Sequence, residues 1–133
     1  MPIQYEYRYM SEPTQKLEIW CAGKDWCPVT ATATLIGKKW HTVVLHRLLD
    51  NGPLGFNALK DEVGGISSKV LSDVLEDLEQ KQLINREIVN EKPVRVEYSL
   101  TDVGESLESV IMEMADWGQE HLMPAATEDS SIA

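Results

Sequence analysis

The stretch FNALKDEVGGISSKVLSDVLEDLEQKQLINREIVNEKPVRVEYSL, residues 56–100, decides the fold. Its first part predicts a short helix over about 56–62, because apolar residues recur there three and four positions apart. A turn containing Gly64 and Gly65 leads into a longer helix over about 67–82. The apolar stripe of this longer helix consists of Leu71, Val74, Leu75 and Leu78. A short helix, a glycine turn and a longer helix have the proportions of a helix-turn-helix.

Two runs with alternating apolar and polar residues follow directly. They cover about 84–88 and 94–100, and the turn Asn90-Glu91-Lys92-Pro93 separates them. This pattern predicts a β-hairpin with one face toward the core and with Arg95, Glu97 and Ser99 facing out. A helix-turn-helix followed by a hairpin with basic residues near its tip predicts a winged helix.

Helices are also predicted on both sides of this stretch. One runs from Pro28 to Ile36 and another from Lys38 to Asp50. Thr101 is expected to cap a long helix that reaches about Leu122. The apolar stripe of this last helix consists of Val103, Leu107, Val110, Ile111, Met114 and Trp117.

The long C-terminal stripe needs a partner surface. One domain offers no obvious second layer for it, so its distal part predicts a dimer interface formed by Ile111, Met114 and Trp117. Packing within one chain remains the alternative. The expected fold class is therefore mainly α (α+β), a winged helix-turn-helix with a long C-terminal dimerisation helix.

Three segments are expected along the chain. Residues 1–26 form an N-terminal arm that is either dimer-associated or only partly ordered. Residues 27–122 form the winged-helix domain for DNA binding and dimerisation. Residues 123–133 form a disordered acidic tail.

The charge balance restricts the partners. The 133 residues include 12 basic and 22 acidic ones, which gives a net charge of −10 and argues against nonspecific DNA coating and anionic membranes. The acidity lies mainly at the ends, because segment 38–99 holds nine basic and ten acidic residues. Contact with DNA through this middle segment therefore stays open. No apolar run approaches the roughly 18 residues of a membrane span, and no signal peptide is evident, so a cytoplasmic protein is expected.

Five short motifs resemble one known family, the HxlR-type winged-helix transcriptional regulators. They occur in the family's order over about residues 27–121, roughly 95 residues, and each is weak alone. The motifs are Cys27-Pro28-Val29, Ile36-Gly37-Lys38-Lys39-Trp40, Gly65-Ile66-Ser67-Ser68-Lys69-Val70-Leu71, Arg95-Val96-Glu97-Tyr98-Ser99-Leu100-Thr101 and Trp117-Gly118.

The resemblance implies a homodimer that binds double-stranded operator DNA as a transcriptional regulator. Some family members sense oxidants or electrophiles through the cysteine before the proline, so an oxidant or small-molecule effector is expected here. The start of the helix over 67–82 would approach the major groove. The wing and the start of the helix over 38–50 would reach the DNA backbone or an adjacent groove. The candidate DNA contacts are Lys38, Lys39, Ser67, Ser68, Lys69, Ser72, Lys92 and Arg95.

The predicted recognition helix is unusually acidic. It carries Asp73, Glu76, Asp77 and Glu79 against only Lys69 and Lys81. Either Asp73 or Glu76 accepts a hydrogen bond from a cytosine amino group, or the acids form a solvated face.

Cys27 is the candidate redox-sensing residue. It precedes a helix N-terminus, and Lys24 is near it in sequence; both features lower a thiol pKa and favour the thiolate. A disulfide with Cys21, a bond between subunits and a purely packing role remain open. The two cysteines are too few for a disulfide scaffold, and no tight ligand spacing indicates a metal site.

Other functional classes are less consistent with this pattern. A winged-helix module that binds a protein and no DNA is the main alternative. Such a module would not need the basic residues Lys69, Lys92 and Arg95 at the start of the recognition helix and on the wing. No phosphate-binding loop, metal pair or nucleophile–base motif is present, so no enzyme activity and no cofactor are expected.

Overall fold

The computed structural model describes residues 27–125. The chain falls into two units, residues 1–35 and 36–133, each described here by itself. The predicted N-terminal arm, Cys21 and most of the predicted acidic tail lie outside the described residues. In the first unit Cys27 precedes helix α2 (Pro28–Ile36), which has the predicted bounds.

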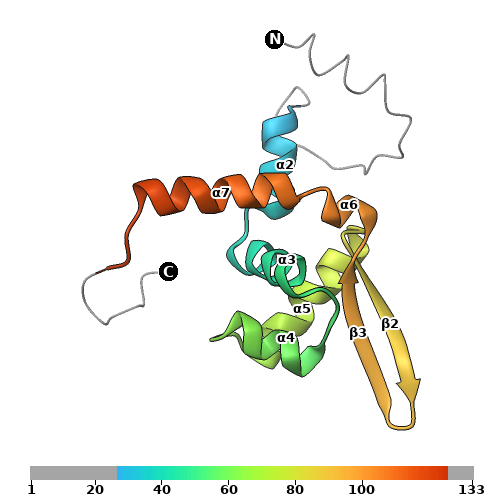
Figure 1. Ribbon diagram of the computed structural model, residues 1–133. Coiled ribbons are helices and arrows are strands. Elements are labelled where there is room, and N and C mark those ends of the chain that lie inside the picture. The colour runs from blue at the N-terminus through green and yellow to red at the C-terminus, as the bar shows by residue number, and fades with distance from the viewer. Residues whose placement is uncertain (1–26, 126–133) are drawn as a thin grey trace. The chain divides into compact units, whose positions relative to one another are not determined.

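The second unit is a winged helix. Helix α3 packs against α4, α5, α7 and β3, so it forms the centre of the unit. The three antiparallel strands have the order β1-β3-β2, and β2 and β3 form the hairpin that extends away from the helices (Figure 1). The elements are α3 (Lys39–Asn51), β1 (Leu54–Gly55), α4 (Phe56–Val63), α5 (Ser68–Gln80), β2 (Ile84–Glu91), β3 (Val94–Leu100), α6 (Asp102–Glu105) and α7 (Glu108–His121). The predicted fold class is confirmed.

The turn between α4 and α5 explains where the longer helix begins. Gly64 and Gly65 have φ values of 74° and 71°, in the left-handed region that glycine adopts without a steric penalty. Ser67 then caps α5, because its hydroxyl accepts a hydrogen bond from the Val70 N–H at 3.1 Å. The two glycines turn the chain sharply, and the serine fixes the first turn of α5.

The core lies between α3, α4 and α5. Fully burying a leucine contributes about 1.5–3 kcal/mol, so these positions supply most of the packing energy that orients α5. The buried apolar side chains of these helices, of the turn after α5 and of β2 are Val44, Leu45, Leu48, Leu59, Leu71, Val74, Leu75, Leu78, Leu83 and Ile84. The predicted stripe of α5 is confirmed in full.

The hairpin differs from the prediction that one of its faces meets the core. In β2 only Ile84 is buried, whereas Ile88 and Val94 near the tip are exposed. That prediction is wrong for the distal half, because the hairpin extends past the helices that would cover it (Figure 1). The sequence pattern also missed β1, whose Leu54 and Gly55 pair with Tyr98 and Glu97 of β3.

The C-terminal helix is divided in two. Thr101 caps α6 as predicted, because its hydroxyl accepts a hydrogen bond from the Gly104 N–H at 3.0 Å. The helix ends after four residues, where the Ser106 hydroxyl donates to the Val103 carbonyl at 2.5 Å. The Leu107 N–H bonds to the Gly104 carbonyl, which tightens the chain into a turn before α7 begins at Glu108. The predicted continuous helix from Thr101 to Leu122 is therefore corrected to α6 and α7.

Candidate DNA-binding surface

The outward face of α5 lies opposite its buried stripe. Successive helical residues are rotated by about 100°, so the buried leucines leave Lys69, Ser72, Asp73 and Glu76 on the exposed side. Ser68 in the first turn is also exposed. The structure thus brings three of the predicted DNA contacts, Ser68, Lys69 and Ser72, together at the start of α5. The fourth, Ser67, caps the helix with its hydroxyl.

The wing carries the second group of predicted contacts. Arg95 pairs with Asn90 across the hairpin and Lys92 lies in the turn between the strands, so both lie near the tip. Both side chains are exposed. The two cations are therefore accessible on the part of the molecule that extends farthest from the helices (Figure 1).

Lys38 and Lys39 form the third group, at the start of α3. Lys38 occupies the N-cap position and is exposed. The Lys39 ammonium lies 4.5 Å from the centre of the Trp40 ring, a cation–π contact. Within residues 27–125 no hydrogen bond or ion pair joins this group to α5 or to the wing.

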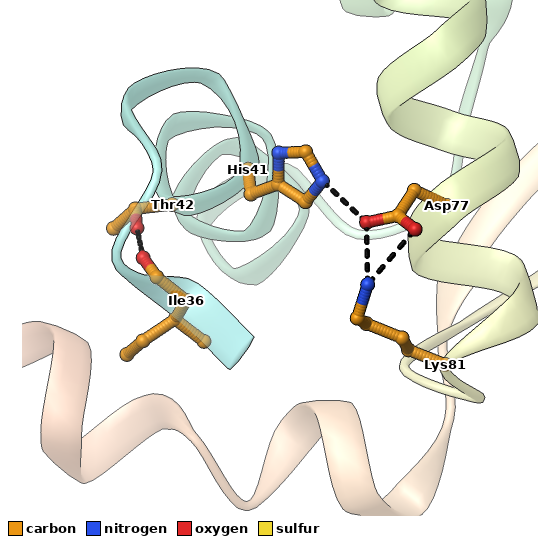
Figure 2. A network of polar contacts seen from close by, with 5 residues as sticks. All are labelled: Ile36, His41, Thr42, Asp77 and Lys81. Atoms are coloured by element: carbon orange, nitrogen blue, oxygen red, sulfur yellow. Dashed lines mark hydrogen bonds and ion pairs between the residues drawn. The ribbon is translucent and has the colours of Figure 1, made fainter. Parts of the chain in front are cut away.

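Asp77 faces into the protein, unlike the other acids of α5. His41 Nε2 lies 2.7 Å from Asp77 Oδ2, and the Lys81 ammonium lies 2.8 Å and 2.7 Å from the two carboxylate oxygens (Figure 2). An ionised carboxylate only accepts hydrogen bonds, so His41 Nε2 is the donor. Burial raises the pKa of Asp77, but the hydrogen bonds from Lys81 and His41 outweigh it and hold the pKa below its usual value.

This cluster of His41, Asp77 and Lys81 links the start of α3 to the last turn of α5. Figure 2 also shows the Thr42 hydroxyl donating to the Ile36 carbonyl, which fixes the first turn of α3 to the preceding residues. Sequence reasoning missed the cluster. A signal was available, because His41 shares the spacing of the buried residues Val44, Leu45 and Leu48 on α3.

The predicted dimer residues do not share one environment. Ile111 is only 3% exposed, and α7 packs against α3, so Ile111 belongs to the protomer's own core. Met114 and Trp117 are 48% and 59% exposed. Val110 is exposed at the matching spacing, and the rings of Trp117 and His121 lie 4.8 Å apart. These four residues, Val110, Met114, Trp117 and His121, are called the α7 stripe below.

Cys27 is half-buried at the start of α2. Hydrogen bonds with the backbone and hydroxyl of Thr30, and then with the backbone of Val29, lower the pKa of its thiol, and burial opposes them only weakly. The predicted effect of the helix start on the thiol is therefore confirmed in direction. Lys24 lies outside the described residues.

The described part of the chain has neither a metal-binding cluster nor a membrane-spanning helix. Residues 27–125 contain no group of three or more His, Cys, Asp and Glu side chains placed to hold a metal ion. Their helices include none with the length and apolar character needed to cross a membrane.

Comparison with known proteins gives a consistent result. YodB of Bacillus subtilis, an HTH-type transcriptional regulator, is 36% identical over 106 residues, which cover 79% of this chain and 94% of YodB. The structure of reduced YodB matches with a TM-score of 0.64 at 35% identity over 76% of this chain and 99% of YodB. The oxidised form of the redox regulator HypR matches with a TM-score of 0.67 at 33% identity over 73% of this chain and 99% of HypR. The HxlR-like helix-turn-helix family model matches residues 35–126, and the chain belongs to this family of transcriptional regulators.

Proposed function

We propose that this chain is a cytoplasmic, sequence-specific DNA-binding regulator that acts as a homodimer and not as an enzyme. The observation that carries the proposal is the arrangement of α5 and the wing. The groove-facing side of α5 begins with exposed Ser68 and Lys69, and the wing presents Lys92 and Arg95 at its tip. Exposed cations on both a helix and a hairpin suit a reader that contacts bases with the helix and the backbone with the hairpin.

The start of α5 suits the edge of the major groove for a further reason. The first backbone N–H groups of a helix lack helical partners, and the helix dipole is positive there. Ser67 satisfies one of these N–H groups, and the others remain available to phosphate oxygens near Ser68 and Lys69. Positioning by the backbone then leaves side chains farther along α5 to discriminate between bases.

The homodimer would form through the α7 stripe. Exposed Met114 and Trp117 lie on one side of α7, and Val110 extends the same side by one turn. Aromatic residues and methionine are enriched at protein interfaces, so exposed Met114 and Trp117 suit a contact between two copies. Two recognition helices held in this way would read two half-sites about one turn of DNA apart.

We further propose that modification of Cys27 switches DNA binding. YodB has been solved in reduced, diamide-treated and quinone-bound forms, and HypR in reduced and oxidised forms. In this chain a thiol with a lowered pKa stands at the start of α2. Its thiolate would add to a ring carbon of a quinone, so that a C–S bond forms, the C=C π bond breaks, and the carbonyl oxygen that receives the electron pair takes up a proton. Alternatively, two thiols would transfer two electrons and two protons to a peroxide and form a disulfide.

The DNA contacts are tested by fluorescence anisotropy of the reduced full chain on duplex DNA from upstream of its own gene. Lys69→Ala, Lys92→Ala and Arg95→Ala should each weaken binding by about tenfold. The Arg47→Gln variant is the control, because the Arg47 guanidinium is already bound to the Glu62 carbonyl at 3.0 Å. If the three variants bind like the control, the proposed surface is wrong, and binding of a protein partner becomes the better hypothesis.

The switch is tested by adding diamide or a quinone to the same DNA complex. The unaltered chain should change its affinity, and Cys27→Ser should not. An identical response from Cys27→Ser would assign the effect to another residue. Mass spectrometry of the treated chain locates the adduct or disulfide directly.

A further inference from the structure

The four acidic residues of α5 have different surroundings in the structure, and the sequence alone could not distinguish them. Asp77 is bound by His41 and Lys81. Glu79 borders a shallow groove that also includes residues of β2 and α6. Only Asp73 and Glu76 remain on the outward face, and only Asp73 has a partner there. The Lys69 ammonium lies 3.0 Å from Asp73 Oδ2.

We propose that Lys69 and Asp73 together read one G·C base pair in the major groove of each half-site. Asp73 accepts a hydrogen bond from the cytosine N4 amino group, and Lys69 donates to guanine O6 or N7. This inference rests on the proposed function, because it assigns the specificity of the same surface.

The chemistry of the groove selects this partner. A carboxylate is repelled by phosphates and by the hydrogen-bond acceptors that bases present. The only base group that can donate a hydrogen bond to Asp73 in the major groove is therefore an amino group. The adenine N6 amino group has an acceptor on both sides, N7 and thymine O4. The cytosine N4 amino group has an acceptor on one side only, guanine O6, and Lys69 satisfies that acceptor. A donor and an acceptor held 3.0 Å apart therefore complement G·C better than A·T.

The pair contributes little to the fold itself. Its side chains are 82% and 60% exposed, and ion pairs in such a position add little to stability. What the pair provides is orientation. It keeps the lysine over the same face as the carboxylate, and it offsets the charge that would otherwise drive the outward face of α5 away from DNA.

The test is selection of bound sequences from a random duplex pool by the full chain and three variants. The unaltered chain should enrich a motif with a fixed cytosine in each half-site. Asp73→Ala should keep the rest of the motif and lose roughly tenfold of its preference for cytosine at that position, because only Lys69 then selects the G·C pair. Asp73→Asn should prefer adenine there, because an amide pairs with adenine N6 and N7.

Glu79→Ala is the matched control, because it removes the same charge from the same helix at a position that borders the groove with β2 and α6. It should keep the cytosine and change only the overall affinity. The inference is overturned if Asp73→Ala prefers cytosine as strongly as the unaltered chain does, or if Glu79→Ala weakens that preference equally. A motif from the unaltered chain without a fixed cytosine also overturns it. No enriched motif at all would instead overturn the proposed function. Thermal melting confirms that each variant is folded.

Discussion

His41 and Asp77 are the residues that relate the recognition helix to the rest of the protein most directly. His41 is 8% exposed on α3, and its hydrogen bond reaches the last turn of α5. The packed leucines fix the distance between the two helices, but apolar contacts are not directional. The hydrogen bond adds a preferred rotation and register to the orientation that the buried leucines give α5.

Replacing His41 tests this link. His41→Ala removes one hydrogen bond to a charged partner, which contributes about 1–2 kcal/mol at a partly buried position. Urea unfolding near neutral pH should show a loss of that size. His46→Ala is the control, because His46 pairs with Asp50 at 3.4 Å on the surface of α3, where a loss below about 0.5 kcal/mol is expected. If both variants lose the same free energy of unfolding, the buried hydrogen bond contributes no more to stability than the surface pair does.

The pH dependence of stability tests the Asp77 carboxylate. The pKa of Asp77 is lower in the folded chain than its usual value, so its contribution is fully present above the unfolded-state pKa of about 4. It is lost as the pH falls through the lower folded-state pKa. The stability difference between the unaltered chain and Asp77→Asn should therefore shrink as the pH falls below about 4. A difference that grows on acidification would contradict this sign.

At the scale of elements, the packing of α6 on the segment before β2 depends on a glycine. A Cβ atom on Gly104 would lie 2.2 Å from the Leu83 carbonyl oxygen, a backbone atom that cannot move aside easily. The Thr101 N–H also bonds to this carbonyl, at 3.0 Å. The close approach therefore holds the end of β3 and the start of α6 against the segment that follows α5.

Two glycine substitutions should change the stability of the protein in opposite directions. Gly104→Ala should destabilise the protein by about 1–3 kcal/mol, the usual cost of overpacking. Gly118→Ala on α7 should instead add about 0.5–1 kcal/mol, because its Cβ meets only the Leu122 side chain at 3.8 Å and alanine favours helix. Calorimetric melting temperatures of the two variants measure both effects. A stabilised Gly104→Ala would show that α6 does not pack as described.

The local patterns predicted the elements well and their surroundings less well. The stripe of Leu71, Val74, Leu75 and Leu78 and the Thr101 cap are short-range signals, and the structure confirms them. The exposed distal hairpin could not be predicted, because alternation shows that a strand has two faces but not how far its neighbours extend. The break at Ser106 depends on a side-chain hydrogen bond that competes with the helix, which periodicity does not reveal.

In the candidate site, too, local patterns predicted which residues are exposed but not the contacts with residues distant in sequence. Sequence placed Ser68, Lys69, Ser72, Lys92 and Arg95 on exposed positions of the predicted elements, because capping and the helix period determine which side faces out. It could not distinguish Asp73 from Asp77, since the difference comes from His41, which lies 36 residues before Asp77 on another helix. Ile111 was assigned to a dimer interface for a similar reason, because its burial depends on α3.

At the scale of the whole molecule, the α7 stripe is expected to hold two copies together. Met114→Glu or Trp117→Glu places a charge on this stripe and should convert the dimer to a monomer in analytical ultracentrifugation. Met112→Glu is the control, because Met112 is similarly exposed but lies on the other side of α7. A dimer that survives both stripe variants, or that is lost with the control, would place the interface elsewhere.

Specific recognition by a chain with a net charge of −10 is the central claim. The most direct measurement is the affinity of the reduced full chain for the fragment it enriches most from fragmented genomic DNA, compared with a scrambled duplex over a KCl series. We predict that two chains bind each duplex and that the enriched fragment binds at least about 1000-fold more tightly at physiological salt. Equal affinity for the two duplexes at every salt concentration would contradict the claim.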